Sequence, residues 1–256
     1  MRGEDHKYGQ MALGFTLVDW HDYDAALFDL DGVLTPTAEV HMRAWRDLFT
    51  DYLTLKGETS RPYVDADYFA HIDGKPRYDG VRDFLASRGI PLAEGEPSDP
   101  SDADTVCGLG NRKNDFFAAA LASEGVEPYA GSVALLDHLE SVGTKVAVVS
   151  SSRNAPAVLD AAGLAGRFEV VVDGQVAAQV GLPGKPAPDT FLEAANRLGV
   201  EPERAVVFED AVSGVAAGHA GGFGLVVGVD RGVGADALTD AGADQVVTDL
   251  AELVEP

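Results

Sequence analysis

Cysteine is almost absent from this chain of 256 residues, and basic residues are far outnumbered. The single cysteine, Cys107, excludes an internal disulfide and is typical of a reducing compartment. With 19 basic and 42 acidic residues the formal net charge is -23, which disfavours nucleic acid or an anionic membrane as a partner. No apolar run is long enough to span a membrane, and the first ten residues lack the apolar core of a secretory signal. We therefore expect a cytoplasmic protein that binds neither nucleic acid nor membrane, and we expect a monomer.

Apolar residues are plentiful, and their spacing predicts an α/β protein. They make up 46% of the chain, which is enough to build a real core. Short runs rich in Val and Leu alternate with helical patterns, as in a parallel sheet that is covered on both faces. The predicted strands are 25–30, 145–149, 168–172, 205–208, 225–229 and 245–247, and the predicted helices between them are 132–142, 155–162, 188–198 and 211–220.

A mainly helical block separates the first predicted strand from the others. Apolar residues recur at helical spacing over 37–53, 80–87 and 114–123, whereas 93–104 is rich in Pro, Ser, Asp and Glu and is typical of a solvated loop. An all-helical insertion directly after the first strand would cover the carboxyl ends of the strands as a lid. The expected organisation is a partly disordered N-terminal extension (1–24, with a short strand at 15–18), an α/β core (25–36 and 125–256) and a helical cap (37–124).

Polar side chains follow the predicted strands at the edge where parallel sheets bind their ligands. They are Asp29 and Asp31 after the first strand, Ser150 to Asn154 after the second, Lys185 before the helix at 188–198, and Glu209 with Asp210 after the strand at 205–208. Each alone has a structural explanation as a turn, a helix cap or a surface lysine. Their occurrence together, in this order, indicates one functional site.

The residue types at this edge suit phosphoryl transfer. Asp29, Glu209 and Asp210 offer the oxygen ligands that Mg²⁺ prefers. A carboxylate can also act as a covalent nucleophile toward phosphorus, which is the role predicted for Asp29, and a metal ion would offset the repulsion between the two anions. Asp31 is placed to donate and accept the proton of the reacting hydroxyl. The lysine and the serine run would supply charge and hydrogen-bond donors to the phosphoryl group.

Taken in order, these segments resemble the motifs of the haloacid dehalogenase superfamily. The matching segments are Asp29-Leu30-Asp31-Gly32-Val33, Ser150, Lys185-Pro186 and Glu209-Asp210. The resemblance implies a Rossmann-like, doubly wound parallel sheet with an all-helical cap inserted after the first motif. It further implies that Asp29, Asp31, Ser150 and Lys185 are catalytic, and that Asp29, Asp31, Glu209 and Asp210 hold Mg²⁺.

Within that superfamily the chain is similar to the β-phosphoglucomutase subfamily. The similarity is carried by 28–35 (FDLDGVLT), His41, the cap segments 74–77 and 112–115, and 184–189. It implies that His41 is catalytic through Asp31, that Arg77 grips the non-reacting phosphate and that Lys113 reaches the sugar. Trp45, Gly74, Ser152, Arg153 and Asn154 would complete the substrate contacts. The expected partner is therefore a small phosphorylated sugar.

Two activities would share every core residue of this site. One is an isomerase that interconverts β-D-glucose 1-phosphate and glucose 6-phosphate through an aspartyl-phosphate and glucose 1,6-bisphosphate, and the other is a sugar-phosphate phosphatase. They differ in whether the cap excludes water and holds a second phosphate, so Arg77, Lys113 and His41 favour the mutase. The complete motif set argues against a silent binding module, and its acidic residues argue against a dehalogenase. At position 73 the subfamily pattern has a basic residue, whereas this chain has Asp73. This difference leaves the identity of the sugar phosphate undetermined.

Overall fold

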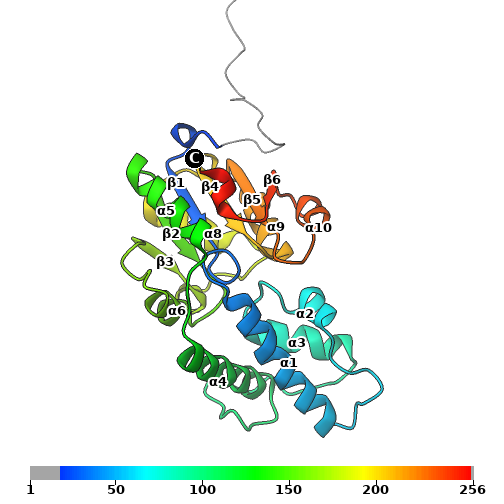
Figure 1. Cartoon of the computed structure of the whole chain (residues 1–256). Coiled ribbons are helices and arrows are strands. Elements are labelled where there is room, and N and C mark those ends of the chain that lie inside the picture. The colour runs from blue at the N-terminus through cyan, green and yellow to red at the C-terminus, as the bar shows by residue number, and fades with distance from the viewer. Residues whose placement is uncertain (1–17, 255–256) are drawn as a thin grey trace, which may run out of the picture.

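The computed structural model describes residues 18–254, which form a parallel sheet and a separate group of helices (Figure 1). The sheet has six strands in the order β3-β2-β1-β4-β5-β6, and every pairing is parallel. The strands are β1 (Ala25–Phe28), β2 (Lys145–Val149), β3 (Val170–Val172), β4 (Ala205–Glu209), β5 (Leu225–Val229) and β6 (Gln245–Val247). The chain runs outward from β1 to β3 and then crosses back to β4. The ends of β1, β2 and β4 therefore meet at the switch point where such sheets bind ligands.

Helices cover both faces of the sheet, and strand β1 shows how the sequence divides between them. Successive residues of a strand point to opposite faces, so Ala26 and Phe28 join one apolar cluster whereas Ala25 and Leu27 join the other. Helices α5 (Ala130–Val142) and α6 (Ala155–Ala161) contribute to the first cluster, and α8 (Asp189–Leu198) and α9 (Val212–Ala220) to the second. The predicted doubly wound sheet is confirmed.

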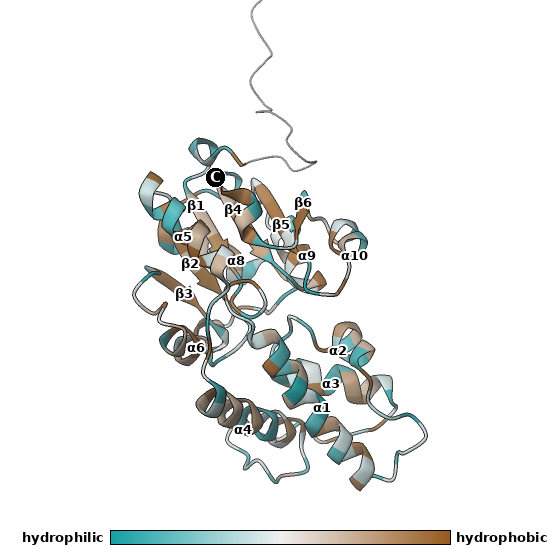
Figure 2. Cartoon of the chain, in the orientation of Figure 1, coloured by the Kyte–Doolittle hydropathy of each residue, from teal (hydrophilic) through white to brown (hydrophobic). Residues whose placement is uncertain are grey.

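The insertion after β1 consists of helices α1 (Thr37–Leu55), α2 (Asp65–His71), α3 (Arg77–Ser87) and α4 (Val106–Glu124), and the segment 93–104 contains no helix or strand. These helices have an apolar cluster of their own, in which the Phe49 ring stacks on Trp45 and contacts the tilted ring of Phe84. Figure 2 shows both polar and apolar residues along α1, and its buried residues Trp45, Leu48 and Phe49 join this cluster. The insertion thus has an apolar core of its own.

Several elements differ from the sequence prediction. The short helices α2, α7 (Gly174–Val180) and α10 (Ala235–Asp240) were not predicted, since so few residues present little periodicity, although α6 of similar length was predicted. Helix α4 begins at Val106, well before the predicted residue 114, because the Thr105 hydroxyl accepts a hydrogen bond from the backbone N–H of Gly108 and caps it. The 3-10 helices η2 (Pro202–Arg204) and η3 (Leu250–Leu253) complete the core.

The N-terminal part that the structure describes belongs to the core rather than to an extension. A short 3-10 helix, η1 (Trp20–Asp22), buries Trp20 against Phe208 and His138. The boundary predicted at residue 24 therefore lies too late in the chain. The strand expected at 15–18 lies outside the described residues, apart from Val18, which is in no strand. Among the helices between residues 18 and 254, none combines the length and the apolar character that crossing a membrane requires.

Candidate active site

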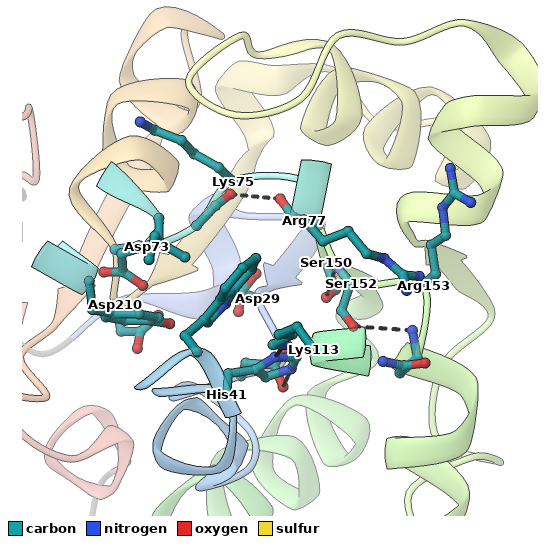
Figure 3. A pocket seen from close by; sticks show the side chains of 18 of the residues that line it. Asp29, His41, Asp73, Lys75, Arg77, Lys113, Ser150, Ser152, Arg153 and Asp210 are labelled. Carbon is teal, nitrogen blue, oxygen red and sulfur yellow. Dashed lines mark hydrogen bonds and ion pairs between the residues drawn. The ribbon is translucent and has the colours of Figure 1, made fainter. Parts of the chain in front are cut away.

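A pocket between the cap and the carboxyl ends of β1, β2 and β4 collects the residues predicted for the site (Figure 3). It is lined by Asp29, Asp31, His41, Trp45, Gly74, Arg77, Lys113, Ser150, Ser152, Arg153, Asn154, Glu209 and Asp210, together with several residues that were not predicted. Lys185 alone of the predicted set does not line the pocket. Its side chain is almost fully buried beneath the floor.

Lys185 joins two carboxylates of the floor. Its ammonium donates to Asp29 Oδ1 at 2.5 Å, to Glu209 Oε1 at 3.2 Å and to the Val149 carbonyl at 3.1 Å. Burial alone would lower the pKa of Lys185, but the two carboxylates more than offset it and hold the pKa above its ordinary value. The lysine is therefore a permanent cation that reaches the pocket floor from below.

Asp29, Glu209 and Asp210 form a cluster that could hold a metal ion, with one oxygen of each lying within 4.8 Å of the others. Burial raises the pKa of all three carboxyl groups, and each is raised further by its carboxylate neighbours. One lysine cannot neutralise three buried carboxylates, so a divalent cation with a preference for oxygen fits the donor set. Asp31, which was predicted as a fourth ligand, is absent from this cluster.

Two glycines make room for these carboxylates. A Cβ at Gly214, in the first turn of α9, would lie 1.5 Å from Glu209 Oε1, and a Cβ at Gly32 would lie 1.8 Å from Asp210 Oδ2. Gly32 also has a φ of 92°, a conformation that other residues rarely adopt. Gly214 was missed by the sequence analysis, because a glycine within an Ala- and Gly-rich helix carries no signal of its own.

The carboxylate of Asp31 turns away from the cluster toward the cap. Its Oδ1 accepts a hydrogen bond from the Thr37 hydroxyl and lies 3.5 Å from His41 Nε2, and both partners belong to α1. Burial would raise the pKa of Asp31, but His41 and Thr37 hold it below its ordinary value. The first cap helix thus carries the groups that set the protonation of Asp31.

Lys113 of α4 completes this chain of contacts. Its ammonium is hydrogen-bonded to Nδ1 of His41 and lies 5.2 Å above the ring of Trp45 and 5.0 Å from that of Phe117. Burial lowers the pKa of Lys113 to about 7; the Asp31 charge opposes this shift, and the Arg77 charge adds a smaller lowering effect. Burial, and then the Lys113 charge, lower the pKa of His41 as well. A bound anion would restore the full charge of the lysine.

The segment after β2 is held by hydrogen bonds from its own backbone to two serine hydroxyls. Ser150 Oγ accepts a hydrogen bond from the N–H of Ser152, and Ser152 Oγ accepts one from the N–H of Asn154. The Asn154 side chain donates to Asn114 Oδ1 of α4 at 2.7 Å, which links this turn to the cap. Ser150 is almost fully buried and lines the same pocket as Asp29.

A second cationic region lies at the cap side of the pocket. Figure 3 shows the Arg77 and Arg153 side chains on the same side of the pocket, and both guanidinium groups lie within 6 Å of the Tyr78 ring centroid. Burial and the charge of Arg153 lower the pKa of Arg77, although Tyr78 opposes the shift. Two cations that repel each other in a pocket form a site that an anion would stabilise.

Asp73 is an unexpected acidic residue in the pocket. Burial raises its pKa to about 6, with a further contribution from the Asp29 charge, and the buried phenol of Tyr68 lies beside it. The sequence resemblance led us to expect a basic residue at this position. Its place between the cap and the carboxylate cluster could not have been read from the cap sequence alone.

The fold and this set of aspartates, serine and lysine define the class of protein. The chain belongs to the haloacid dehalogenase-like hydrolase family, whose model matches residues 23–222. It is 51% identical over 238 residues to a β-phosphoglucomutase of Mycobacterium tuberculosis, covering 90% of this chain and 91% of the relative. It is 32% identical over 229 residues to the β-phosphoglucomutase of Bacillus subtilis, covering 90% and 91%. The crystal structure of β-phosphoglucomutase from Clostridium difficile has a TM-score of 0.73 at 25% identity, covering 91% of this chain and 93% of that one. The resemblance inferred from the motifs is confirmed.

Proposed function

We propose that this enzyme is a Mg²⁺-dependent β-phosphoglucomutase that interconverts β-D-glucose 1-phosphate and glucose 6-phosphate. The observation that carries the proposal is the presence of two separate regions for anions in one pocket. Ser150 and Lys185 would serve a reacting phosphoryl group beside Asp29, and the cations Arg77 and Lys113 of the cap and Arg153 of the core would serve a second one. A bisphosphate intermediate requires both regions. The similarity to β-phosphoglucomutases over 90% of the chain supports the same activity.

Asp29 would act as the nucleophile in one half-reaction and, as the aspartyl-phosphate, would be the phosphoryl donor in the other. Its carboxylate oxygen forms a bond to phosphorus of glucose 1,6-bisphosphate, and the bond between that phosphorus and the sugar oxygen breaks. The sugar oxygen takes its proton from Asp31, which returns as base when the other sugar hydroxyl attacks the aspartyl-phosphate. Lys185 neutralises charge on the carboxylate and on the transferred group.

Magnesium would be held by Asp29, Glu209 and Asp210, where it would offset the repulsion between the nucleophile and the phosphate. Asp31 was also predicted as a ligand, but we do not assign its carboxylate to the metal, since Thr37 and His41 engage it. Both residues belong to the cap helix α1 and stabilise the ionised carboxylate, which is the form of Asp31 that accepts the proton of the attacking sugar hydroxyl, so this base would depend on its contacts with the cap. This coupling would suppress transfer to water.

The direct test is one reaction that contains Mg²⁺, β-D-glucose 1-phosphate and a trace of glucose 1,6-bisphosphate, in which glucose 6-phosphate and free phosphate are followed in parallel. Glucose 6-phosphate without matching phosphate release is the expected result. Free phosphate alone would instead identify a sugar-phosphate phosphatase, the alternative that uses the same core residues.

The Arg77→Ala variant tests whether the two anion regions have different roles. It is expected to lower mutase turnover by about 100-fold or more, because a buried charged contact to the second phosphate is lost. Hydrolysis of p-nitrophenyl phosphate, which has no second phosphate, should change much less. The matched control is Arg82→Ala on the same helix, whose guanidinium pairs with Glu94 on the surface at 2.7 Å. Equal losses on both substrates in Arg77→Ala would contradict the assignment.

A further inference from the structure

The cap loop between α2 and α3, residues 72–76, is held on the core by two serine hydroxyls. Ser151 Oγ donates to the carbonyl of Gly74 at 2.7 Å, and Ser213 Oγ donates to the carbonyl of Asp73 at 3.1 Å. The two serines come from different parts of the core, one after β2 and the other in the first turn of α9. Consecutive carbonyls of one cap loop are therefore bonded from both sides of the pocket.

The loop also fits the core closely. Gly74 has a φ of 70°, and a Cβ there would lie 2.2 Å from Ser213 Oγ and 3.0 Å from the Ala211 Cβ. A Cβ at Gly184 would lie 2.6 Å from Cγ of Pro76, so this glycine leaves the space that the proline fills. Gly184 directly precedes Lys185. The loop is thus seated on three segments of the core that border the carboxylate cluster.

The loop leads directly into the second anion region. Arg77 is the first residue of α3 and follows Pro76, so the position of the two bonded carbonyls determines where its guanidinium lies. Asp73 at the other end of the loop reaches toward the metal-binding carboxylates. Releasing the loop would therefore withdraw Arg77 and open the floor of the pocket to water in one movement.

We propose that Ser151 and Ser213 form a two-hydroxyl latch that holds the cap closed and so directs the phosphoryl group of Asp29 to the sugar rather than to water. The expected effect of the latch on the reaction products rests on the proposed function. The expected effect on the position of the cap does not. Both residues are positioning residues, since their hydroxyls bond the cap backbone and not the reacting atoms. Ser151 lies within the predicted run Ser150 to Asn154, but its contact with the cap was not predicted, and Ser213 was not singled out at all, because a serine that binds a distant carbonyl leaves no pattern in the chain.

The test compares Ser151→Ala, Ser213→Ala and the double variant with the unaltered enzyme. One neutral hydrogen bond changes an equilibrium by about fivefold, so each single variant should raise the ratio of free phosphate to glucose 6-phosphate about fivefold and the double variant about 25-fold. The ratio is measured within one reaction, so loss of active protein does not alter it. The matched control is Ser87→Ala, a half-buried serine that donates to the Phe84 carbonyl of its own helix.

Hydrogen exchange at the amides of 72–78, without substrate, provides the second readout. Exchange should accelerate about fivefold in each single variant and remain unchanged in Ser87→Ala. If the exchange rates in both serine variants matched the rate in the control, the proposed latch would be refuted, whatever the ratio of products. If exchange accelerated while the product ratio stayed constant, the latch would hold the cap without directing the phosphoryl group, and that part of the proposal would fail. An unaltered enzyme that makes no glucose 6-phosphate would refute the proposed function, and the exchange result would still decide the latch.

Discussion

The Lys185 ammonium lies 2.5 Å from Oδ1 of Asp29, although the two residues are 156 positions apart in the chain. The contact is formed because β1 lies next to β4 and β2 in the sheet, and because the lysine enters from the loop before α8. It leaves the nucleophile paired with a cation on one side and open to the pocket on the other. The same lysine also reaches Glu209, so its removal would expose two buried carboxylates at once.

Lys185→Met is expected to reduce turnover by a factor of about 100 to 1,000, which is typical when one charged group that stabilises a transition state is removed. In metal-free protein at pH 7 it should also lower the free energy of unfolding by about 3–5 kcal/mol, since two buried carboxylates lose their partner. Urea unfolding and steady-state turnover measure the two effects. Lys56→Met is the control, because that lysine pairs with Asp104 at the surface. Similar losses in both variants would show that Lys185 has no special role.

The carboxylate cluster makes the metal-free protein sensitive to pH. Burial raises the pKa of Glu209 and Asp210 well above their ordinary values of 4.5 and 3.8. A carboxyl group with a raised pKa binds its proton more tightly in the folded state. The stability it contributes is therefore present below about pH 4 and is lost as the pH rises toward the folded-state pKa.

We accordingly expect the thermal midpoint of metal-free protein to fall between pH 5 and pH 8, and Mg²⁺ to restore it at pH 8 by binding the ionised cluster. Glu209→Gln should flatten this decline, because one titrating group is gone, and should weaken the Mg²⁺ response. Scanning calorimetry with and without EDTA measures both effects. A midpoint that is constant with pH in the absence of metal, or that does not respond to Mg²⁺, would contradict the assignment of the cluster.

The pKa of Lys113, lowered to about 7, predicts a pH effect on substrate binding. Below pH 7 the ammonium is charged and attracts the phosphorylated sugar, whereas at pH 8 about one tenth remains charged in the free enzyme. The KM for β-D-glucose 1-phosphate should therefore rise by up to about tenfold between pH 6 and pH 8. In Lys113→Met the KM should be high throughout and lose this dependence. If the variant kept the same pH profile as the unaltered enzyme, the titrating group would be another residue.

The sheet and the core of the site could be predicted from the sequence, and their physical reasons are local. Strands β2, β5 and β6 were predicted with their observed bounds, because runs of Val and Leu between helices are typical of strands buried on both faces. Asp29, Glu209 and Asp210 end such strands, so the parallel arrangement brings them to one edge. Identifying the strands was enough to predict the cluster.

The contacts between the cap and the core could not be predicted in this way. Asp73, Ser151 and Ser213 meet across the interface of two units whose relative position depends on the whole fold. Their residue types do not indicate their partners, since two of the contacts are made to backbone carbonyls. The buried position of Trp20 was missed for a similar reason, because its partner Phe208 lies far along the chain.

Gly214→Ala tests whether the cluster depends on the space beside it. The added Cβ would lie 1.5 Å from Glu209 Oε1, so the carboxylate must move away from its position between Lys185 and the metal site. We expect a loss of about 1–3 kcal/mol in stability from overpacking. Mg²⁺ affinity should fall at least about tenfold, because one ligand is displaced from the cluster. Gly166→Ala is the control, since a Cβ there would meet no atom within 4 Å. Calorimetric titration with Mg²⁺ gives the affinity, and circular dichroism establishes that each variant folds. Unchanged Mg²⁺ affinity in a folded Gly214→Ala protein would mean that Glu209 does not bind the ion, and that Asp29 and Asp210 hold it without this residue.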